Sequence, residues 1–244
     1  MKQNKYDDNV FFEKYGRMAR SIGGLAFAGE WPLLQAMLPD LRGKRLLDLG
    51  CGYGWHCRYA RERQARYVLG IDLSEKMLSR ARELTDDEAI EYRRTAIEDL
   101  EAPEESFDVV LSSLALHYVE DFGAVCRKAN RLLVPGGVFV FSVEHPIFTS
   151  RAEQDWHYGA EGEAQHWPVD GYHEEGPRIA RFLEEDVVKY HRAVASYLNS
   201  LIDTSFRLTL VSETKPTQEM LDRNPEMRME MRRPMFLLVS AAKG

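Results

Sequence analysis

Short apolar runs alternate with longer amphipathic segments from about residue 45 to residue 145. Five of these runs have the length and the turn boundaries of strands, and segments of helical period lie between them. This alternation predicts an open, mostly parallel sheet that is covered by helices. The predicted strands span residues 46–49, 66–72, 90–95, 107–111 and 138–143.

The alternation stops near residue 145 and gives way to a polar, aromatic and turn-rich segment over 147–183. Residues 164–172 and 178–183 have the pattern of hairpin strands. Because a structureless loop of this length is improbable inside a compact domain, we expect a small cap over the strand ends. The remaining predicted elements are a helix over 185–202, strands over 206–212 and 235–241, and a second, methionine-rich lid over 215–233.

The chain has 244 residues and 44% hydrophobic content, which suits one sizeable core. We therefore expect residues 1–244 to form a single elaborated domain. Aromatic and apolar residues recur at helical spacing over 6–29, and a second helix is expected over 30–38. The expected divisions are an N-terminal helical lid (1–40), a ligand-binding core (40–146), a cap insertion (147–183), and a C-terminal helix with the last two strands (184–244).

The first strand ends in a glycine-rich turn, within the sequence RLLDLGCGYGW at 45–55. Glycine at alternate positions over 50–54 lets the backbone approach a ligand closely, and free N–H groups face that ligand. The dinucleotide fingerprint G-x-G-x-x-G would require glycine at residue 55, which is Trp55. Asp48 adds negative charge at the mouth of the turn. The stretch predicts a small-molecule site that favours an ammonium or sulfonium ligand over a dinucleotide.

A second acid, Asp72, ends the second predicted strand, 24 residues after Asp48. In a doubly wound sheet an acid at this place can accept both hydroxyls of a ribose. Ser74 follows it and is a good N-cap for the next helix. Asp72 alone could serve ordinary turn chemistry, but together with the glycine turn it predicts binding of a nucleoside.

These motifs resemble the class I S-adenosylmethionine-dependent methyltransferases that act on small molecules. The resemblance rests on D-x-G-x-G-x-G at 48–54, Asp72, FDVV–S–LALHYV between 107 and 119, and PGG at 135–137, which is expected to close the preceding helix. It covers roughly residues 40–145 by motif and the late strands by layout. It implies an α/β fold with a doubly wound, mostly parallel, seven-stranded Rossmann-like sheet whose last strand is antiparallel, with the cap inserted after the fifth strand.

The resemblance also implies S-adenosyl-L-methionine as cofactor. Many family members have an aspartate that contacts the adenine amine where this chain has Ala96, so Glu98 or the backbone amide of Ile97 is expected to take that contact over. The implied cofactor-binding residues are Asp48, Gly50, Cys51, Gly52, Gly54, Asp72, Leu73, Met77, Ile97, Glu98 and Ser113.

Methyl transfer from a sulfonium needs a nucleophile held in line with the methyl carbon, and it needs a base only when that nucleophile arrives protonated. His117 and His145 follow the fourth and fifth strands, where a substrate would enter. Each is either a catalytic residue or a structural histidine. The acceptor is expected to be small and at least partly aromatic or apolar. The predicted pocket side chains are Tyr6, Tyr15, Trp156, Trp167 and Tyr172.

Charge and composition argue against several other classes. The net charge is −7 without a basic stripe, which disfavours a nucleic-acid partner. No apolar run approaches the ~20 residues of a membrane span, and the N-terminus lacks a signal-peptide pattern. The three cysteines follow no metal spacing and there is no H-E-x-x-H motif, so no metal is expected. We expect a cytoplasmic protein with reduced thiols and an undetermined oligomeric state.

Two other functions remain open from the sequence. One is a non-catalytic S-adenosylmethionine-binding regulatory protein, against which the complete glycine turn and the large aromatic cap argue. The other is a nicotinamide-dependent oxidoreductase, which Trp55 disfavours.

Overall fold

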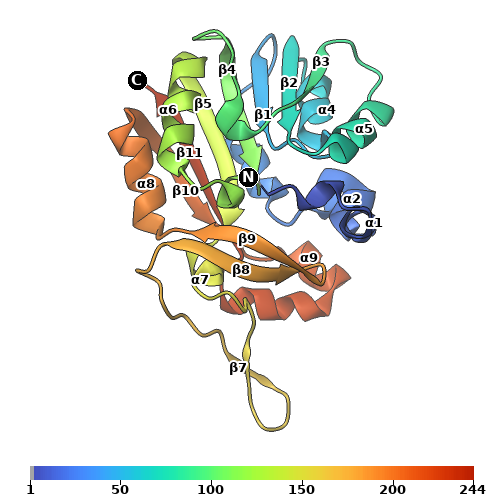
Figure 1. Cartoon of the computed structure of the whole chain (residues 1–244), viewed down its shortest axis with the longest axis vertical. Coiled ribbons are helices and arrows are strands. Elements are labelled where there is room, and N and C mark those ends of the chain that lie inside the picture. Colours follow the sequence, from blue (N-terminus) through green and yellow to red (C-terminus); the bar gives the residue numbers. More distant parts are fainter. Residues whose placement is uncertain (1–2) are drawn as a thin grey trace.

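The computed structural model describes residues 3–244 and contains one central sheet of seven strands (Figure 1). Residues 1 and 2, which belong to the predicted N-terminal lid, lie outside the described range. The strand order is β10-β11-β5-β4-β1-β2-β3. The bounds are β1 (Arg45–Leu49), β2 (Tyr67–Asp72), β3 (Ile90–Arg94), β4 (Phe107–Ser113), β5 (Leu133–Glu144), β10 (Phe206–Glu213) and β11 (Phe236–Lys243).

The pairing confirms the predicted doubly wound, mostly parallel, seven-stranded sheet. β11 pairs antiparallel with both β5 and β10, and the other neighbours in this sheet are parallel. Strands β1 and β4 are adjacent although β2 and β3 separate them in the sequence, so the strand order reverses there. In sheets of this kind, ligands bind beyond the carboxyl ends of the strands at such a reversal.

Helices cover both faces of the sheet, which explains the nearly continuous apolar runs of its central strands. In β1, Leu47 and Leu49 enter the core that is shared with α6 and α8, whereas Leu46 enters the core that is shared with α3 and α4. Asp48 follows the same alternation and faces α4, where Cys57 contacts it. The helix bounds are α3 (Trp31–Met37), α4 (Trp55–Glu62), α5 (Glu75–Glu83), α6 (Phe122–Leu132) and α8 (Val194–Asp203).

The remaining helices and short 3₁₀ segments lie around the carboxyl ends of the strands or connect the main elements. The α-helices are α1 (Asn9–Gly16), α2 (Ala19–Gly23), α7 (Pro146–Thr149) and α9 (Gln218–Arg223). The 3₁₀ segments are η1 (Lys5–Asp7), η2 (Gly24–Phe27), η3 (Ile97–Asp99), η4 (Leu116–Tyr118) and η5 (Pro225–Arg232).

The prediction of one helix over 185–202 is wrong in its first part. Residues Glu185–His191 form β9, which pairs antiparallel with β8 (Gly176–Phe182), and α8 begins only at Val194. The buried positions of β9 alternate at Val187, Lys189 and His191. Because only one of these three is apolar, the two-residue period of a strand was hidden in the hydrophobic pattern.

Strand pairing in the cap also differs from the expectation. β7 (Ala164–His166) pairs with β6 (His157–Tyr158) and not with residues 178–183. The β8–β9 turn places Leu183 and Glu184 at φ 53° and 65°. Positive φ at both central residues is typical of a type I′ turn. In a sequence, such a turn is usually indicated by Asn-Gly at the two central positions. Leu-Glu carries no such signal.

The segment Pro135–Gly137 does not close a helix as expected. α6 ends at Leu132 and β5 begins at Leu133, so this segment lies within the strand. There the register of β5 against β4 shifts between Phe107 and Val109. The turn residues therefore accommodate an irregularity of β5.

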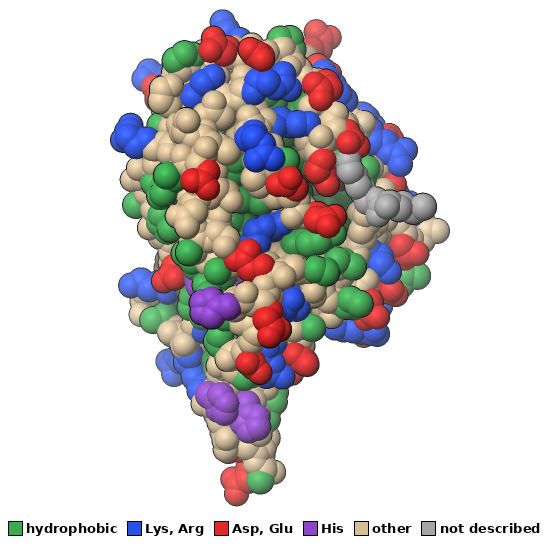
Figure 2. Space-filling view, turned by 60° about the vertical axis from the view of Figure 1, so that its left-hand side comes forward, with side chains coloured by type: hydrophobic (Ala, Val, Ile, Leu, Met, Phe, Trp, Pro, Cys, Tyr) green, Lys and Arg blue, Asp and Glu red, His purple; other side chains and the backbone are tan. Residues whose placement is uncertain are grey.

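Figure 1 shows the β8–β9 hairpin crossing beyond the carboxyl ends of β4 and β5, with α1 and α2 beside it. The β6–β7 hairpin projects away from the body of the molecule, and Figure 2 shows the narrow projection from another side. No helix among residues 3–244 is long and apolar enough to cross a membrane.

Candidate functional site

The glycine turn after β1 adopts a backbone that other residues rarely take. Gly50, Gly52 and Gly54 have φ of 76°, 54° and 71°. A Cβ at Gly50 would lie 2.5 Å from the Cβ of Ala115, and one at Gly54 would lie 2.0 Å from the hydroxyl of Tyr92. At Gly52 the nearest atom would be the flexible end of Met77, 3.2 Å away. Packing within the protein therefore requires Gly50 and Gly54, whereas Gly52 has the most room beside it.

Asp72 connects this turn to the start of α5. Its Oδ2 accepts a hydrogen bond from the Gly52 amide at 2.9 Å, and its Oδ1 accepts one from the Ser74 amide at 2.9 Å. Burial raises the pKa of the Asp72 carboxyl to about 6. The carboxylate is therefore held in one orientation, and each of its oxygens retains a further lone pair for a ligand.

Asp48 is almost completely buried behind the turn. Its Oδ2 accepts from the Cys57 thiol at 3.4 Å and lies 3.9 Å from Nδ1 of His56. Its Oδ1 has no hydrogen-bond partner among the described residues. Burial raises the pKa of Asp48 to about 7. A buried carboxylate oxygen without a donor is costly, and a cationic donor would stabilise it.

Three further polar groups come from the N-terminal helices and were missed in the sequence. Glu30 is 1% exposed, and its Oε1 accepts from Arg20 at 2.8 Å and from the predicted site residue Ser113 at 3.1 Å. The Oε2 of Glu30 and the hydroxyl of Ser21 are buried without a partner in the described part of the chain. Glu30 was interpreted only as the start of a helix, since nothing in its local pattern indicates that Arg20 lies opposite.

An aromatic cluster that includes Tyr6 and Tyr15 packs against the turn, and their role in an acceptor pocket stays a prediction. The Tyr6 ring packs edge-on against Tyr15 at 5.2 Å and Tyr118 at 6.4 Å, and Tyr15 packs against Tyr53 of the turn at 5.7 Å. Asp7 fixes this segment in place, because its Oδ1 accepts from the Ser74 hydroxyl at 2.6 Å and from the Lys76 amide at 3.1 Å. The N-terminal segment is thereby held next to Asp72.

The other predicted cofactor residues lie around the same turn. Cys51 and Met77 are buried, and the Leu73 carbonyl accepts from Asn4 and Arg94. The Cδ1 of Ile97 lies 4.0 Å from the Cβ position of Gly50. The Glu98 carbonyl accepts from Lys128 at 2.6 Å.

His145 has the contacts of a structural histidine. Its Nδ1 accepts from the Ile147 amide at 3.1 Å, which caps α7, and its Nε2 lies 2.8 Å from Glu213. Both ring nitrogens are therefore engaged within the protein, which favours the structural alternative for this residue.

His117 is buried at the end of β4, and only one of its nitrogens has a partner. Its Nδ1 accepts from the Glu144 amide at 3.4 Å, whereas Nε2 makes no hydrogen bond with a described residue. Burial lowers the pKa of His117 to about 4, so the ring is neutral at pH 7.

The predicted pocket residues of the cap do not gather at the turn. Trp156 and Trp167 pack edge-on at 5.3 Å, and the Arg233 guanidinium lies 4.0 Å from the Trp167 ring. The Tyr172 hydroxyl accepts from the Val194 amide at 3.0 Å, at the start of α8. These contacts fasten the cap to the lid and to α8, and a role in an acceptor pocket stays a prediction.

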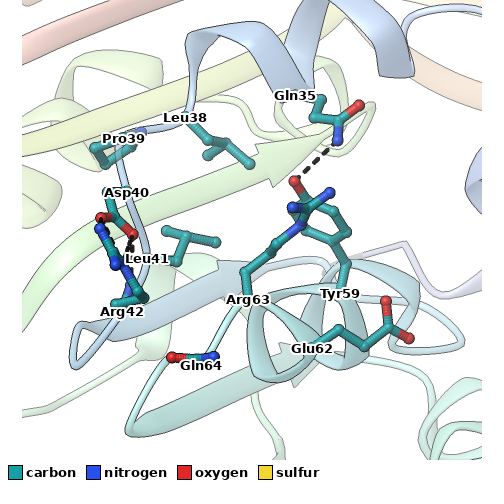
Figure 3. A pocket seen from close by; sticks show the side chains of 10 residues that line it. All are labelled: Gln35, Leu38, Pro39, Asp40, Leu41, Arg42, Tyr59, Glu62, Arg63 and Gln64. Atoms are coloured by element: carbon teal, nitrogen blue, oxygen red, sulfur yellow. Dashed lines mark hydrogen bonds and ion pairs between the residues drawn. The ribbon is translucent and has the colours of Figure 1, made fainter.

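A pocket of about 430 Å³ lies elsewhere, between the ends of α3 and α4 (Figure 3). Its wall includes Arg42, which precedes β1, and Arg63, which stacks on Tyr59 at 5.2 Å. The glycine turn follows β1, so this pocket lies at the other end of that strand. It is separate from the candidate site.

The sheet topology, the D-x-G-x-G-x-G turn and the acid after β2 together define a Rossmann-like methyltransferase domain. Residues 47–141 match the family described as the methyltransferase domain. The structure is similar to a putative S-adenosylmethionine-dependent methyltransferase from Listeria monocytogenes (50% identity, TM-score 0.86, 91% of this chain and 99% of that one). It is also similar to an S-adenosylmethionine-dependent methyltransferase from Mesorhizobium loti (51% identity, TM-score 0.85, 90% of this chain and 100% of that one).

A further relative is the ubiquinone biosynthesis O-methyltransferase of Neisseria meningitidis serogroup C. It is 42% identical over 107 residues, which span 42% of this chain and 45% of that enzyme. The chain belongs to the class I S-adenosylmethionine-dependent methyltransferases. It is an enzyme, and its cofactor is S-adenosyl-L-methionine, as the sequence motifs predicted.

Proposed function

We propose that this enzyme transfers the methyl group of S-adenosylmethionine to a small-molecule acceptor by in-line displacement. The observation that carries the proposal is the group of buried polar atoms without partners beside the glycine turn, which includes Asp48 Oδ1, Glu30 Oε2 and the Ser21 hydroxyl. Buried polar atoms without a hydrogen-bond partner are rare in folded proteins, and a bound ligand can supply the missing hydrogen bonds.

These residues fit the two ends of the cofactor. The Asp72 carboxylate would accept the ribose hydroxyls, and Ile97, Glu98, Leu73 and Met77 are the proposed neighbours of the adenine. The free oxygens of Asp48 and Glu30 would accept the ammonium of the methionyl part, and Arg20 with Ser21 would hold its carboxylate. When bound, the cofactor supplies an electrophilic methyl group on a sulfonium, and the residues hold it in place.

The enclosure of the site supports a small acceptor. The N-terminal segment reaches the β8–β9 hairpin through a 2.7 Å bond from the Val188 amide to Gln3, and through ion pairs of Lys5 with Glu185 at 3.6 Å and Lys14 with Glu184 at 2.5 Å. Such a cover would exclude water from the sulfonium. The relative named as an O-methyltransferase of ubiquinone biosynthesis supports a small-molecule acceptor.

The surface charge supports the same class of acceptor. Acidic and basic side chains are interspersed over the face seen in Figure 2, and the net charge is −7. A nucleic-acid acceptor would favour a continuous basic surface.

Substitution of Gly52 tests the proposed position of the cofactor. Gly52→Val places a branched side chain at φ 54° beside the site, so S-adenosylmethionine should bind at least ~100-fold more weakly in calorimetry. The matched control is Gly136→Val, which has φ 73° and open space around it far from the turn. Normal binding by a folded Gly52→Val variant would place the cofactor elsewhere.

A further inference from the structure

We propose that the methyl acceptor reacts through a carboxylate, and that His117 donates the hydrogen bond that positions it. This inference rests on the proposed transfer to a small molecule and specifies the chemical class of that molecule. It comes from the buried groups at the carboxyl ends of β4 and β5, which present hydrogen-bond donors and no free proton acceptor.

The first of these groups is Glu144, the last residue of β5. Its Oε1 accepts from the Lys189 ammonium at 2.6 Å, and its Oε2 accepts from the Gln154 amide at 3.0 Å. Burial alone would raise the pKa of Glu144, but nearby His117 and Lys189 hold it below its ordinary value. Each oxygen already accepts a hydrogen bond from a buried donor, and the lowered pKa makes the carboxylate a weak proton acceptor, so Glu144 is poorly suited to act as a base.

Lys189 is the second group, and it comes from β9 of the hairpin. Its side chain is 2% exposed, and its ammonium bonds to Glu144 and, at 3.0 Å, to Gln154, with the Phe182 ring 5.4 Å away. An ammonium has three N–H donors, and two of them are used here. The ion pair with Glu144 brings the hairpin to the end of β5 and keeps a buried cation next to His117.

The third group is His117 itself, whose proton position follows from its contacts. Nδ1 accepts a hydrogen bond from the Glu144 amide, so it cannot carry a proton itself. A neutral ring must therefore carry its proton on Nε2. His117 can then donate a hydrogen bond but cannot accept a proton at Nδ1. Nε2 lacks a partner among the described residues, which leaves this donor for a ligand.

The charged and titratable groups around His117 favour an anion. Arg20 on α2 is paired with Glu30, and Lys189 is paired with Glu144. Arg192 at the end of β9 bonds to the backbone carbonyls of residues 119 and 120 and makes no ion pair with a described carboxylate. The phenols of Tyr6 and Tyr118 lie 3.5 Å apart, and burial raises the pKa of both. The paired charges cancel, and Arg192 leaves a net positive charge.

A carboxylate meets these conditions better than an alcohol or an amine. It is already ionised at neutral pH and accepts hydrogen bonds through both oxygens. One oxygen would accept from His117 Nε2, and a lone pair of the carboxylate would form the new C–O bond to the methyl carbon. The C–S bond breaks, its electron pair stays on sulfur, and a methyl ester and a neutral thioether result without any proton transfer. An alcohol or a protonated amine would need a base that these groups do not supply.

The experiment uses the full-length enzyme, methyl-labelled S-adenosylmethionine, and a panel of small aromatic and aliphatic acids with their matched alcohols, amides and amines. A small-molecule extract of bacterial cells serves as a second source of acceptors. We expect label in the acids only, and release of that label as methanol in mild alkali, because methyl esters hydrolyse there and methyl ethers and amines do not. With S-adenosylmethionine saturating, the value of kcat/KM for the acceptor should be flat between about pH 6 and pH 9.

Variants separate a contact with the acceptor from a structural role. His117→Phe should lower kcat/KM about tenfold or more while the Kd for S-adenosylmethionine changes less than about twofold, and His117→Asn, which keeps an N–H donor, should recover part of the loss. The control is His166→Phe, an exposed histidine on the projecting hairpin.

Alkali-stable label on an alcohol or an amine would overturn the proposal, as would failure of every acid in both acceptor sources. Equal loss of cofactor binding and of activity in His117→Phe would make His117 structural and overturn its assigned role. If the wild-type enzyme fails to bind S-adenosylmethionine, the proposed function fails before the acceptor is tested, so the two failures are distinguishable.

Discussion

At the scale of single residues, Asp72 has a structural role in addition to the ribose contact that we propose for it. Its carboxylate accepts the Gly52 and Ser74 amides in the ligand-free protein, so it stabilises the turn as well as facing the proposed ribose. Replacement by alanine would therefore leave two N–H groups without acceptors and cost about 1–3 kcal/mol of unfolding free energy. Replacement of a residue that only binds ligand would leave the unfolding free energy of the ligand-free protein nearly unchanged.

Asp72→Asn is consequently the sharper test, because an amide oxygen can still accept one of those hydrogen bonds. We expect cofactor affinity to fall by about 1.5–3 kcal/mol, the range for hydrogen bonds to a charged group, with a smaller loss of stability than in Asp72→Ala. Calorimetry and thermal melts of both variants check this. If Asp72→Asn binds S-adenosylmethionine with the affinity of the wild type, the carboxylate does not bind the ribose hydroxyls.

The two buried acids also predict a pH dependence of cofactor binding. Burial raises the pKa of Asp72 to about 6 and that of Asp48 to about 7, above the ordinary value of about 3.9. Each acid therefore contributes stability to the ligand-free fold that is present below pH 4 and is lost as the pH rises through 6 and 7. A cationic ligand binds the ionised acids better, so affinity should rise between about pH 5 and pH 7.

Binding should release protons over that range, which calorimetry in buffers of different ionisation enthalpy can count. Asp48→Asn should flatten the upper part of the curve, because it removes the group with the pKa near 7. An affinity that is constant or falls as the pH rises contradicts the assignment of the ammonium to Asp48.

At the scale of elements, the sequence predicted all seven strands of the central sheet but missed β9, which buries a charged side chain. β1, β2 and β4 are buried on both faces, so their runs were visible. β9 buries Lys189 and His191, and their partners come from residues far away in the chain, at Glu144 and Thr149. Such pairs compensate buried charge only in the folded state, so no local pattern could indicate the strand.

The residues of the candidate site also fall into those that the local sequence indicates and those that only long-range contacts define. The turn residues and Asp72 could be predicted because motif and spacing encode them locally. Arg20, Glu30 and Lys189 were missed because each is defined by a long-range partner. The cap aromatics Trp156 and Trp167 were predicted from composition alone, and composition does not say which cluster a ring joins.

The N-terminal segment provides a prediction at the element scale. Asp7 binds it to the start of α5 through Ser74 and Lys76 and lies 3.4 Å from Arg94. Asp7→Ala should loosen residues 3–8 and raise the dissociation rate of S-adenosylmethionine about five- to tenfold, with little change in the melting temperature. Stopped-flow displacement measures the rate, and hydrogen exchange measures the loosening.

Asp8→Ala is the matched control for that variant. Asp8 caps α1 through the Phe11 amide at 3.0 Å and lies next to Asp7 in the chain, but it does not bind the start of α5. If both variants accelerate dissociation equally, the effect comes from α1 and not from the attachment at Ser74.

At the scale of the whole molecule, three separate parts of the chain meet beyond the strand ends. The N-terminal segment contacts the start of α5 on one side and the β8–β9 hairpin on the other, and the hairpin reaches β5 through Lys189 and Glu144. These links are few and several are exposed, and exposed ion pairs contribute only about 0–1 kcal/mol each. The cover is therefore expected to open more readily than the sheet.

Cofactor and acceptor should close this cover, and hydrogen exchange followed by mass spectrometry can locate the effect. We expect slower exchange over residues 3–8 and 183–189 when both ligands are present, because these segments contact each other across the site. The projecting β6–β7 hairpin, 157–166, should exchange at an unchanged rate, since its strands pair only with each other and point away from the body. Protection confined to 157–166 would instead place the acceptor on that projection and refute enclosure by the N-terminal segment and the β8–β9 hairpin.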